Sequence, residues 1–299
     1  MSSSTDRLSK KVTQVSATKS KSADSTGLRK VLQNPTFKRK LKMDKYVIPA
    51  GTEASKFLQF SPGTDHIHLV IEAGAHLSAT ALMNMAPGSS HHITLSVEQH
   101  ERSSFNLVTF TLRGGDYKGT VHIKLLGKGA EARVAGAVIA DGNESVEKQL
   151  LIEHAAEGCV SEMLYKQILT DESRGLIEGK VLVQPGAQQT VSHQTFGNLC
   201  ISPEAQALSR PMLEIYADDV KCNHGATVGK LDESALLYMR QRGIPETEAR
   251  LLLQHAFVSD VLQHVPNEEL REKISHLIEH RFRGELNACQ GCSLCDSKA

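Results

Sequence analysis

The stretch from Tyr46 to about Val228 is a succession of short apolar segments separated by Gly, Pro, Asn and Asp. The segments are rich in Val, Ile, Leu and Thr, which suit β-strands, and the separating residues favour turns. No amphipathic helix of convincing length interrupts them, which argues against a doubly wound α/β sheet. The clearest expected strands are His68–Glu72, His92–Val97, Asn106–Leu112, Thr120–Leu126, Arg133–Ile139, Gln149–His154, Leu176–Val183 and Met212–Tyr216.

A loose internal repeat runs through these segments. An aliphatic strand leads into a glycine and a small residue and then into another strand, and Gly129, Gly158 and Gly186 mark three such corners. A period of roughly 20–30 residues made of strands and tight corners is typical of a β-solenoid, whose coils bury their inward side chains against one another. A β-sandwich also alternates strands and turns, so the residue pattern alone leaves both folds open.

Helical patterns begin after Lys230. Asp232 is expected to cap a first helix that ends at Arg242, Pro245 fits the first turn of a second helix, and Asn267 can cap a third. The second helix is expected to bury Leu252, Leu253, Ala256, Phe257 and Val261, and the third Leu270, Ile274, Leu277, Ile278 and Phe282. The apolar stripe of the third helix needs a partner, which is the second helix, the end of the solenoid or another protein.

Charge and composition narrow the classes of partner. The 34 basic residues balance 34 acidic ones, aromatic residues make up 4%, and there is no Trp. The chain therefore lacks both a global electrostatic attraction to nucleic acid or anionic membrane and the aromatic platforms that stack bases. No apolar stretch is long enough to span a membrane, and the N-terminus lacks the apolar core of a secretory signal, so we expect a cytoplasmic protein with protein partners.

Cys222 and His224 are the first candidate metal ligands. Two residues apart on a strand, they project to the same face, where a thiolate and an imidazole can share iron or zinc. Two ligands are fewer than a stable site needs, so others must come from elsewhere or from a partner chain. The alternative is that Cys222 is a buried apolar residue and His224 a hydrogen-bonded residue at a strand end.

The segment from Ala217 to Ile244, ADDVKCNHGATVGKLDESALLYMRQRGI, closely resembles the signature block of the SufB/SufD family of iron–sulfur cluster assembly scaffolds. Its Cys-Asn-His-Gly-Ala-Thr-Val-Gly run, followed by Leu-Asp-Glu and a helix, looks like the SufD branch. The resemblance continues to the RFRGEL segment and so covers roughly the last third of the chain. Family members usually carry a longer helical N-terminal region, whereas the strands of this chain begin by about Tyr46.

The resemblance implies a mainly β fold, namely a right-handed parallel β-helix followed by a C-terminal α-helical domain. It also implies a non-enzymatic scaffold that pairs with a SufB-like subunit or with itself, binds a SufC-like ABC ATPase through the C-terminal helices, and holds an iron–sulfur cluster or iron transiently at an interface containing Cys222 and His224. With this fold, the chain divides into a disordered Ser/Thr/Lys-rich tail (1–27), a short basic arm (28–45), a β-helix core (46–228), a helical domain (229–286) and a Cys-rich tail (287–299).

Cys289, Cys292 and Cys295 form a C-x2-C-x2-C run near the C-terminus. It is similar to the opening of a bacterial ferredoxin motif, but the fourth Cys and the Pro of that motif are absent. A three-thiolate cluster, a zinc site completed by a partner, and an unstructured tail are the three interpretations.

Other motifs carry less weight. His91-His92 beside a turn and the His276–His280 pair are interpreted as solvated or capping histidines. Gly127-Lys128-Gly129 is a turn, and since the Walker A sequence is absent, we expect a partner to bind the nucleotide. Two other functions remain as alternatives: a carbohydrate-active β-helix enzyme, which needs a carboxylate-lined groove, and a small iron–sulfur carrier that uses the C-terminal cysteines.

Overall fold

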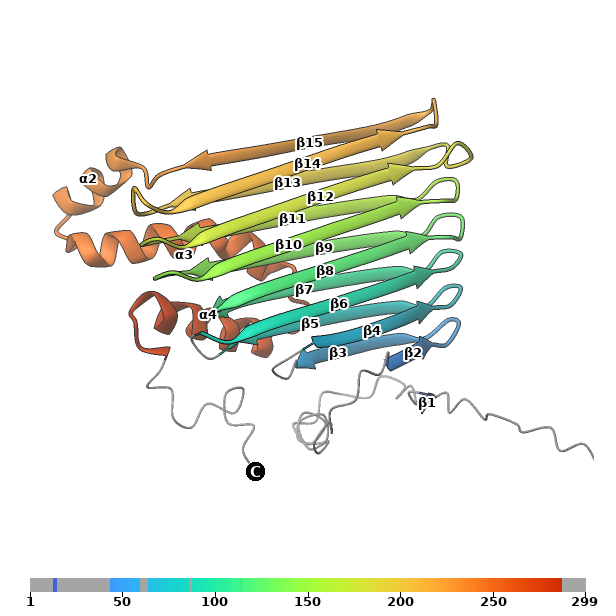
Figure 1. The fold of residues 1–299 in the computed structure, drawn as a ribbon, viewed down its shortest axis with the longest axis horizontal. Coiled ribbons are helices and arrows are strands. Elements are labelled where there is room, and N and C mark those ends of the chain that lie inside the picture. Colours follow the sequence, from blue (N-terminus) through green and yellow to red (C-terminus); the bar gives the residue numbers. More distant parts are fainter. Residues whose placement is uncertain (1–12, 15–43, 60–63, 86–87, 114, 287–299) are drawn as a thin grey trace, which may run out of the picture.

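The computed structural model describes residues 13–14, 44–59, 64–85, 88–113 and 115–286. Within these residues, strands alternate between two sheets in which every strand pairs in parallel with its neighbours, and three helices follow (Figure 1). The predicted parallel β-solenoid followed by helices is therefore confirmed. A sandwich of antiparallel sheets is excluded, because its strands would run in alternating directions.

The first sheet contains, in spatial order, β1 (Thr13–Gln14), β2 (Asp44–Ile48), β4 (Thr64–Ile71), β6 (Ser90–Gln99), β8 (Asp116–Leu125), β10 (Ser145–His154), β12 (Arg174–Val183) and β14 (Gln206–Ile215). The second contains β15 (Val220–Gly229), β13 (Thr190–Cys200), β11 (Val160–Leu169), β9 (Glu131–Ala140), β7 (Ser104–Arg113), β5 (His76–Asn84) and β3 (Glu53–Gln59). The helices are α2 (Glu233–Gln241), α3 (Glu246–Gln263) and α4 (Glu268–Phe282).

Each coil consists of one strand from each sheet, and equivalent residues of successive coils pair directly. Asp116 of β8, Ser145 of β10 and Arg174 of β12 lie side by side at intervals of 29 residues. Alternate side chains of each strand point into the lumen between the sheets. Aliphatic residues such as Ile123 and Ile152 fill most of this lumen and form its main core.

The corners between the first sheet and the second turn through left-handed residues. Gly129 (φ 67°) and Gly158 (φ 69°) occupy this conformation, and their N–H groups donate to the carbonyls of Glu157 and Gln188 in the next coil. Only glycine adopts this conformation without steric cost, so the sequence signal at these two corners is confirmed. Gly186 also lies in its predicted corner, but the left-handed residue there is Gln189 (φ 59°), because the connection from β12 to β13 is one residue longer.

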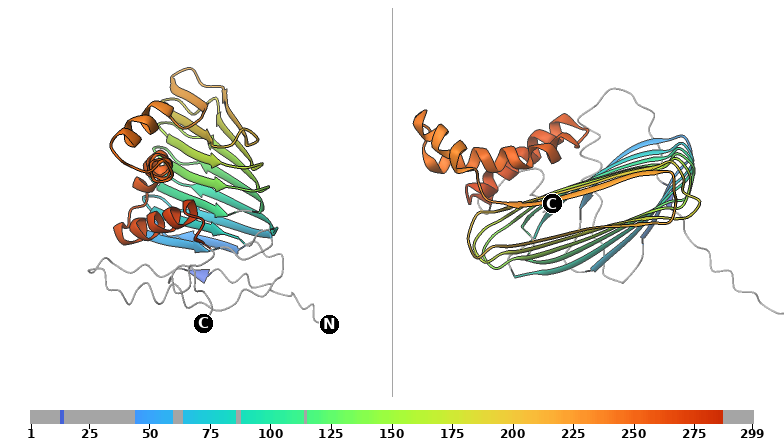
Figure 2. Two further views of the ribbon diagram at one scale, coloured as in Figure 1. Left: turned by 90° about the vertical axis from the view of Figure 1, so that its left-hand side faces the viewer. Right: turned by 90° about the horizontal axis from the view of Figure 1, so that it is seen from above.

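The helices pack on the outer face of the second sheet (Figure 2). Outward residues of this sheet, including Phe110 and Ala137, form a second core with Val258 of α3 and Ile278 of α4. Asn106 of β7 donates to the carbonyl of His264 at 3.1 Å, just beyond α3. The solenoid and α3 are therefore the partners that the apolar stripe of α4 requires.

A buried arginine joins α4 to the solenoid. Arg281 is 5% exposed and donates to the carbonyl of Leu112 at the end of β7. Its guanidinium also pairs with Asp141 and, at 3.5 Å, with Glu144 in the corner after β9. The hydrogen bond from Arg281 lowers the pKa of Asp141, whereas burial raises the pKa of Glu144.

Most of the helix ends lie where the sequence predicts them. Asp232 caps α2 by accepting from the N–H groups of Ser234 and Ala235, and Asn267 caps α4. Pro245 precedes α3 as its cap residue and does not lie within its first turn.

The expected apolar face of α3 is partly wrong. Leu252 is 45% exposed, while Ala249, Val258 and Leu262 are buried together with Val261. The reason is that α3 contacts the solenoid on one side and α4 on another, so a single stripe does not describe it. Among the described residues, no helix has the length and apolarity needed to cross a membrane.

Candidate functional site

Cys222 and His224 lie on β15, the last strand of the second sheet. Their register partners on β13 are Ser192 and Gln194, which are buried in the lumen. Directly paired residues of parallel strands share a face of the sheet, so both candidate ligands point to the lumen side of β15. Cys222 is half-buried against the core, and His224 is exposed.

The lumen is open at this end, because no described strand pairs beyond β14 or β15 (Figure 1). Lumen-facing residues of the last coil are consequently exposed: Ile215 is 38% and Val228 61% accessible. Together with Pro211, Leu213 and Val220, they form an apolar rim around Cys222 and His224, which we call the open end.

Pro211 is suited to this position at the edge of the sheet. Gln206, the first residue of β14, and Tyr216, which directly follows the strand, donate their N–H groups toward β12. Since the direction alternates along a strand, the N–H group that Pro211 lacks would point to the free edge. Proline therefore costs this sheet no hydrogen bond.

The environment of Cys222 keeps its thiol protonated. Burial raises the pKa of Cys222, and the backbone of Ser192 opposes that shift only in part. A protonated thiol is a poor ligand, so metal binding at Cys222 would have to displace the proton.

A column of polar side chains continues from Cys222 into the lumen. Ser192 Oγ lies 2.8 Å from Ser161 Oγ, which lies 2.8 Å from Nε2 of His154. All three residues are buried, and burial lowers the pKa of His154 to about 4, so this imidazole is neutral. This column was not predicted from the sequence, although Ser161, Ser192 and Cys222 occupy paired positions in successive coils.

A second polar group lies at the helix end of the same lumen. Asn198 bonds with Gln167, accepts from Ser209 Oγ at 2.9 Å and donates to the carbonyl of Thr227. These bonds tie β14 and β15 to the preceding coil, and so they hold the open end in place.

The described residues alone do not complete a metal site. They contain no group of three or more His, Cys, Asp or Glu side chains arranged to hold a metal ion. Within that part of the chain, no further such side chain joins Cys222 and His224 in a group of three. Cys289, Cys292 and Cys295 lie outside the described residues.

Among the residues that the structure places, the remaining histidines do not gather into a metal site. His91 is buried, which corrects the solvated interpretation, and its ring nitrogen lies 2.8 Å from Ser89 Oγ. His276 is near Glu279 at 4.0 Å, and His280 contacts Glu285 at 3.0 Å. The carboxylate beside His280 comes from beyond the helix, a neighbour that the i, i+4 spacing did not reveal.

The outer helix α2 presents a second exposed apolar surface. Leu237 and Tyr238 are 54% and 58% exposed, and the Arg242 guanidinium stacks over the Tyr238 ring at 5.2 Å. Only Leu236 of this helix is buried. Most of the length of this helix is therefore exposed.

Comparison with known proteins gives one consistent result. The protein-family model for the SUF system FeS cluster assembly, SufBD core domain, matches residues 52–257 of this chain. The iron–sulfur cluster assembly protein SufD of Escherichia coli (strain K12) is 30% identical over 241 residues, covering 78% of this chain and 57% of that protein. An iron–sulfur cluster assembly SufBD family protein of Mycobacterium leprae is 30% identical over 230 residues, covering 73% and 58%. The chain thus spans a little over half the length of these relatives.

Proposed function

The chain belongs to the SufB/SufD family of iron–sulfur cluster assembly proteins and is SufD-like, and on this basis we propose that it is a scaffold subunit of a SUF assembly complex. In this proposal it catalyses no reaction itself. Its part is to present Cys222 and His224 at an interface where a partner chain supplies the remaining ligands for iron or a transient iron–sulfur cluster.

The observation that carries this proposal is the open end of the solenoid. An unpaired last coil with an exposed apolar rim is a surface that a protein normally covers. A partner covering it would bury Cys222 and His224 in the shared interface. We propose a SufB-like subunit as this partner, with a second copy of the chain as the alternative.

The chemistry of the two side chains suits temporary metal binding. Thiolate and imidazole both bind iron, but two ligands from one chain hold it weakly. A cluster assembled between two chains can be released when they separate. The raised pKa of Cys222 adds a proton that competes with the metal.

The C-terminal helices are the proposed docking site for a SufC-like ABC ATPase. Leu237 and Tyr238 on α2 supply the exposed apolar contacts, and α3 and α4 connect them to the solenoid. We assign nucleotide binding to that partner, since the chain has no Walker A sequence. A cytoplasmic location is part of the proposal and agrees with the free thiols of Cys159, Cys200 and Cys222.

Co-expression with a SufB-like subunit and a SufC-like ATPase tests the proposal. We expect a complex that contains all three chains and binds iron under anaerobic conditions. Cys222→Ser and His224→Asn should lower bound iron while the complex and the solenoid stay intact, whereas Cys200→Ser is the matched thiol control. Normal iron content in both ligand variants would refute their role.

The interface is tested separately. Ile215→Asp places a charge on the rim of the open end and should abolish binding of the SufB-like subunit, because a buried unpaired carboxylate is strongly unfavourable. Leu126→Asp makes the same change at an exposed leucine in the corner between β8 and β9. Equal binding by both variants would contradict the proposed docking surface.

A further inference from the structure

A lysine lies inside the solenoid lumen. Lys148 on β10 occupies the same face as Val146, Leu150 and Ile152, and its side chain is only 3% exposed. A buried ammonium group normally pairs with a carboxylate or loses its proton. Within the described part of the chain, burial is the sole influence on the pKa of Lys148, which falls to about 7, and no acidic group opposes that shift.

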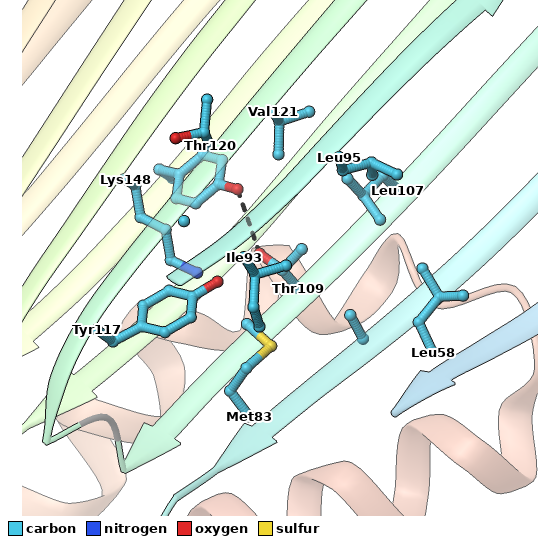
Figure 3. A pocket seen from close by; sticks show the side chains of 13 residues that line it. Leu58, Met83, Ile93, Leu95, Leu107, Thr109, Tyr117, Thr120, Val121 and Lys148 are labelled. Atoms are coloured by element: carbon cyan, nitrogen blue, oxygen red, sulfur yellow. Dashed lines mark hydrogen bonds between the residues drawn. The ribbon is translucent and has the colours of Figure 1, made fainter. Parts of the chain in front are cut away.

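The surroundings of Lys148 are shaped by a tyrosine and a glycine. Its Nζ lies 4.1 Å from the centre of the Tyr117 ring and points into a cavity between the sheets (Figure 3). Gly119 is the register partner of Lys148 on β8, and a Cβ at this position would lie 2.5 Å from the Tyr117 hydroxyl. The absence of a side chain at Gly119 therefore lets Tyr117 fold over beside the lysine.

The polar side-chain groups around the cavity are a few hydroxyls and the amine of Lys148. Tyr165 reaches it from β11, with its hydroxyl 3.2 Å from Oγ1 of Thr109. The other strands that line the cavity contribute apolar side chains, apart from Thr120. These are Leu58, Ala81, Met83, Ile93, Leu95, Leu107 and Val121.

The size of the cavity restricts what it can hold. Its volume is about 30 Å³, enough for about two or three water-sized particles, since a single water needs roughly 10–15 Å³ on this scale. Phosphate esters and carboxylic acids are larger than this. A ligand that complements the cavity must accept hydrogen bonds, carry one negative charge and be close to monatomic.

We propose that this cavity is a binding site for a small monatomic anion of chloride or bromide size, held by the Lys148 ammonium group and the Tyr117 hydroxyl. The anion supplies the countercharge that no described side chain provides. Because the lysine must be protonated to hold it, anion binding takes up a proton whenever Lys148 starts as the neutral amine.

Proton uptake makes the affinity depend on pH. The titratable groups that face Nζ are Tyr117 from β8 and Tyr165 from β11; burial raises the pKa of both, so they stay neutral. Above the pKa of Lys148, the apparent Kd for the anion should rise about tenfold for each pH unit, because one proton binds with each anion.

Crystals of the full chain soaked in sodium bromide test the location of the site. We expect an anomalous bromide peak within hydrogen-bonding distance of Lys148 Nζ below pH 7. The same soak of Lys148→Met, whose apolar side chain has nearly the same length, should give no peak there. A wild-type lumen without bromide, or a peak that survives in Lys148→Met, would overturn the proposal.

Thermal unfolding in solution gives an independent measurement. Bromide should raise the Tm of the wild type more than an equal concentration of methanesulfonate, and the difference should disappear in Lys148→Met. Tyr117→Phe should weaken bromide binding about tenfold, the usual loss for one hydrogen bond to an ion. Lys124→Met, at an exposed lysine on β8, is the control. An equal bromide effect in Lys148→Met and Lys124→Met would contradict the assignment.

Discussion

Replacing Arg281 with methionine should loosen the helices from the solenoid. The substitution keeps most of the side-chain volume but removes the charge that Asp141 and Glu144 share, as well as the donor to the Leu112 carbonyl. Removing one partner of a buried ion pair costs about 3–5 kcal/mol. Asp141 is 41% exposed, so water screens part of the pair, and we expect a loss near the lower limit, about 3 kcal/mol.

For a folded unit of this size, a loss of about 3 kcal/mol lowers the Tm by about 6–12 °C. Differential scanning calorimetry of Arg281→Met against the wild type measures this shift directly. Arg283→Met is the matched control at the C-cap of α4, since Arg283 forms only exposed pairs with Glu248 and Glu279. A wild-type Tm in Arg281→Met, or equal losses in the two variants, would refute the assignment of Arg281 as the main polar link between helices and solenoid.

Two further predictions concern the lumen. Gly136→Ala would place a Cβ 2.2 Å from the ring of buried Tyr165 and should destabilise the fold by about 1–3 kcal/mol in urea unfolding. Gly225→Ala is the control and should be neutral, because no atom lies within 4 Å of its Cβ. Similar losses of stability in the two variants would contradict the overpacking argument. Burial lowers the pKa of His154 from 6.5 to about 4, so its folded state resists protonation, and the wild type should lose about 3 kcal/mol as the pH falls from 6.5 to 4. His154→Gln should flatten that slope in unfolding titrations, and an unchanged slope would assign the acid sensitivity to other groups.

The strand-rich fold could be predicted from local signals in the sequence. Glycines at 129 and 158 mark left-handed corners, and Asp232 and Asn267 mark helix starts, because each satisfies a local backbone requirement. Gly186 also marks its corner, but an extra residue there moves the left-handed position to Gln189. Local signals of this kind report on backbone geometry within a few residues and do not register such a shift.

Residues that depend on contacts between distant segments were harder to predict. Leu252 belongs to an apolar helix face by spacing, yet it is exposed, because α3 is held between two partners whose positions only the tertiary structure fixes. Arg281 and Lys148 read as ordinary surface residues in the sequence but are buried. The alternation of apolar residues around Lys148 does indicate a buried position, since Val146, Leu150 and Ile152 share its strand face.

The candidate site was predictable in part. Spacing alone indicates that Cys222 and His224 share a strand face, and the register with Ser192 and Gln194 agrees. Which of the two faces they occupy, and that they lie on the final coil, depends on the register of strands some 30 residues apart. Most of the polar column below Cys222 has the same origin, because Ser161, Ser192 and Cys222 become neighbours only when the coils stack.

The 29-residue interval between the strands of the middle coils also bears on how proteins of this kind change length. Asp116, Ser145 and Arg174 occupy equivalent positions in successive coils, and so do Glu131 and Val160. A tandem duplication or deletion of one 29-residue unit would leave every remaining strand beside a neighbour of compatible register. Evolution can therefore add or remove whole coils of such a solenoid and still keep the same first and last coils.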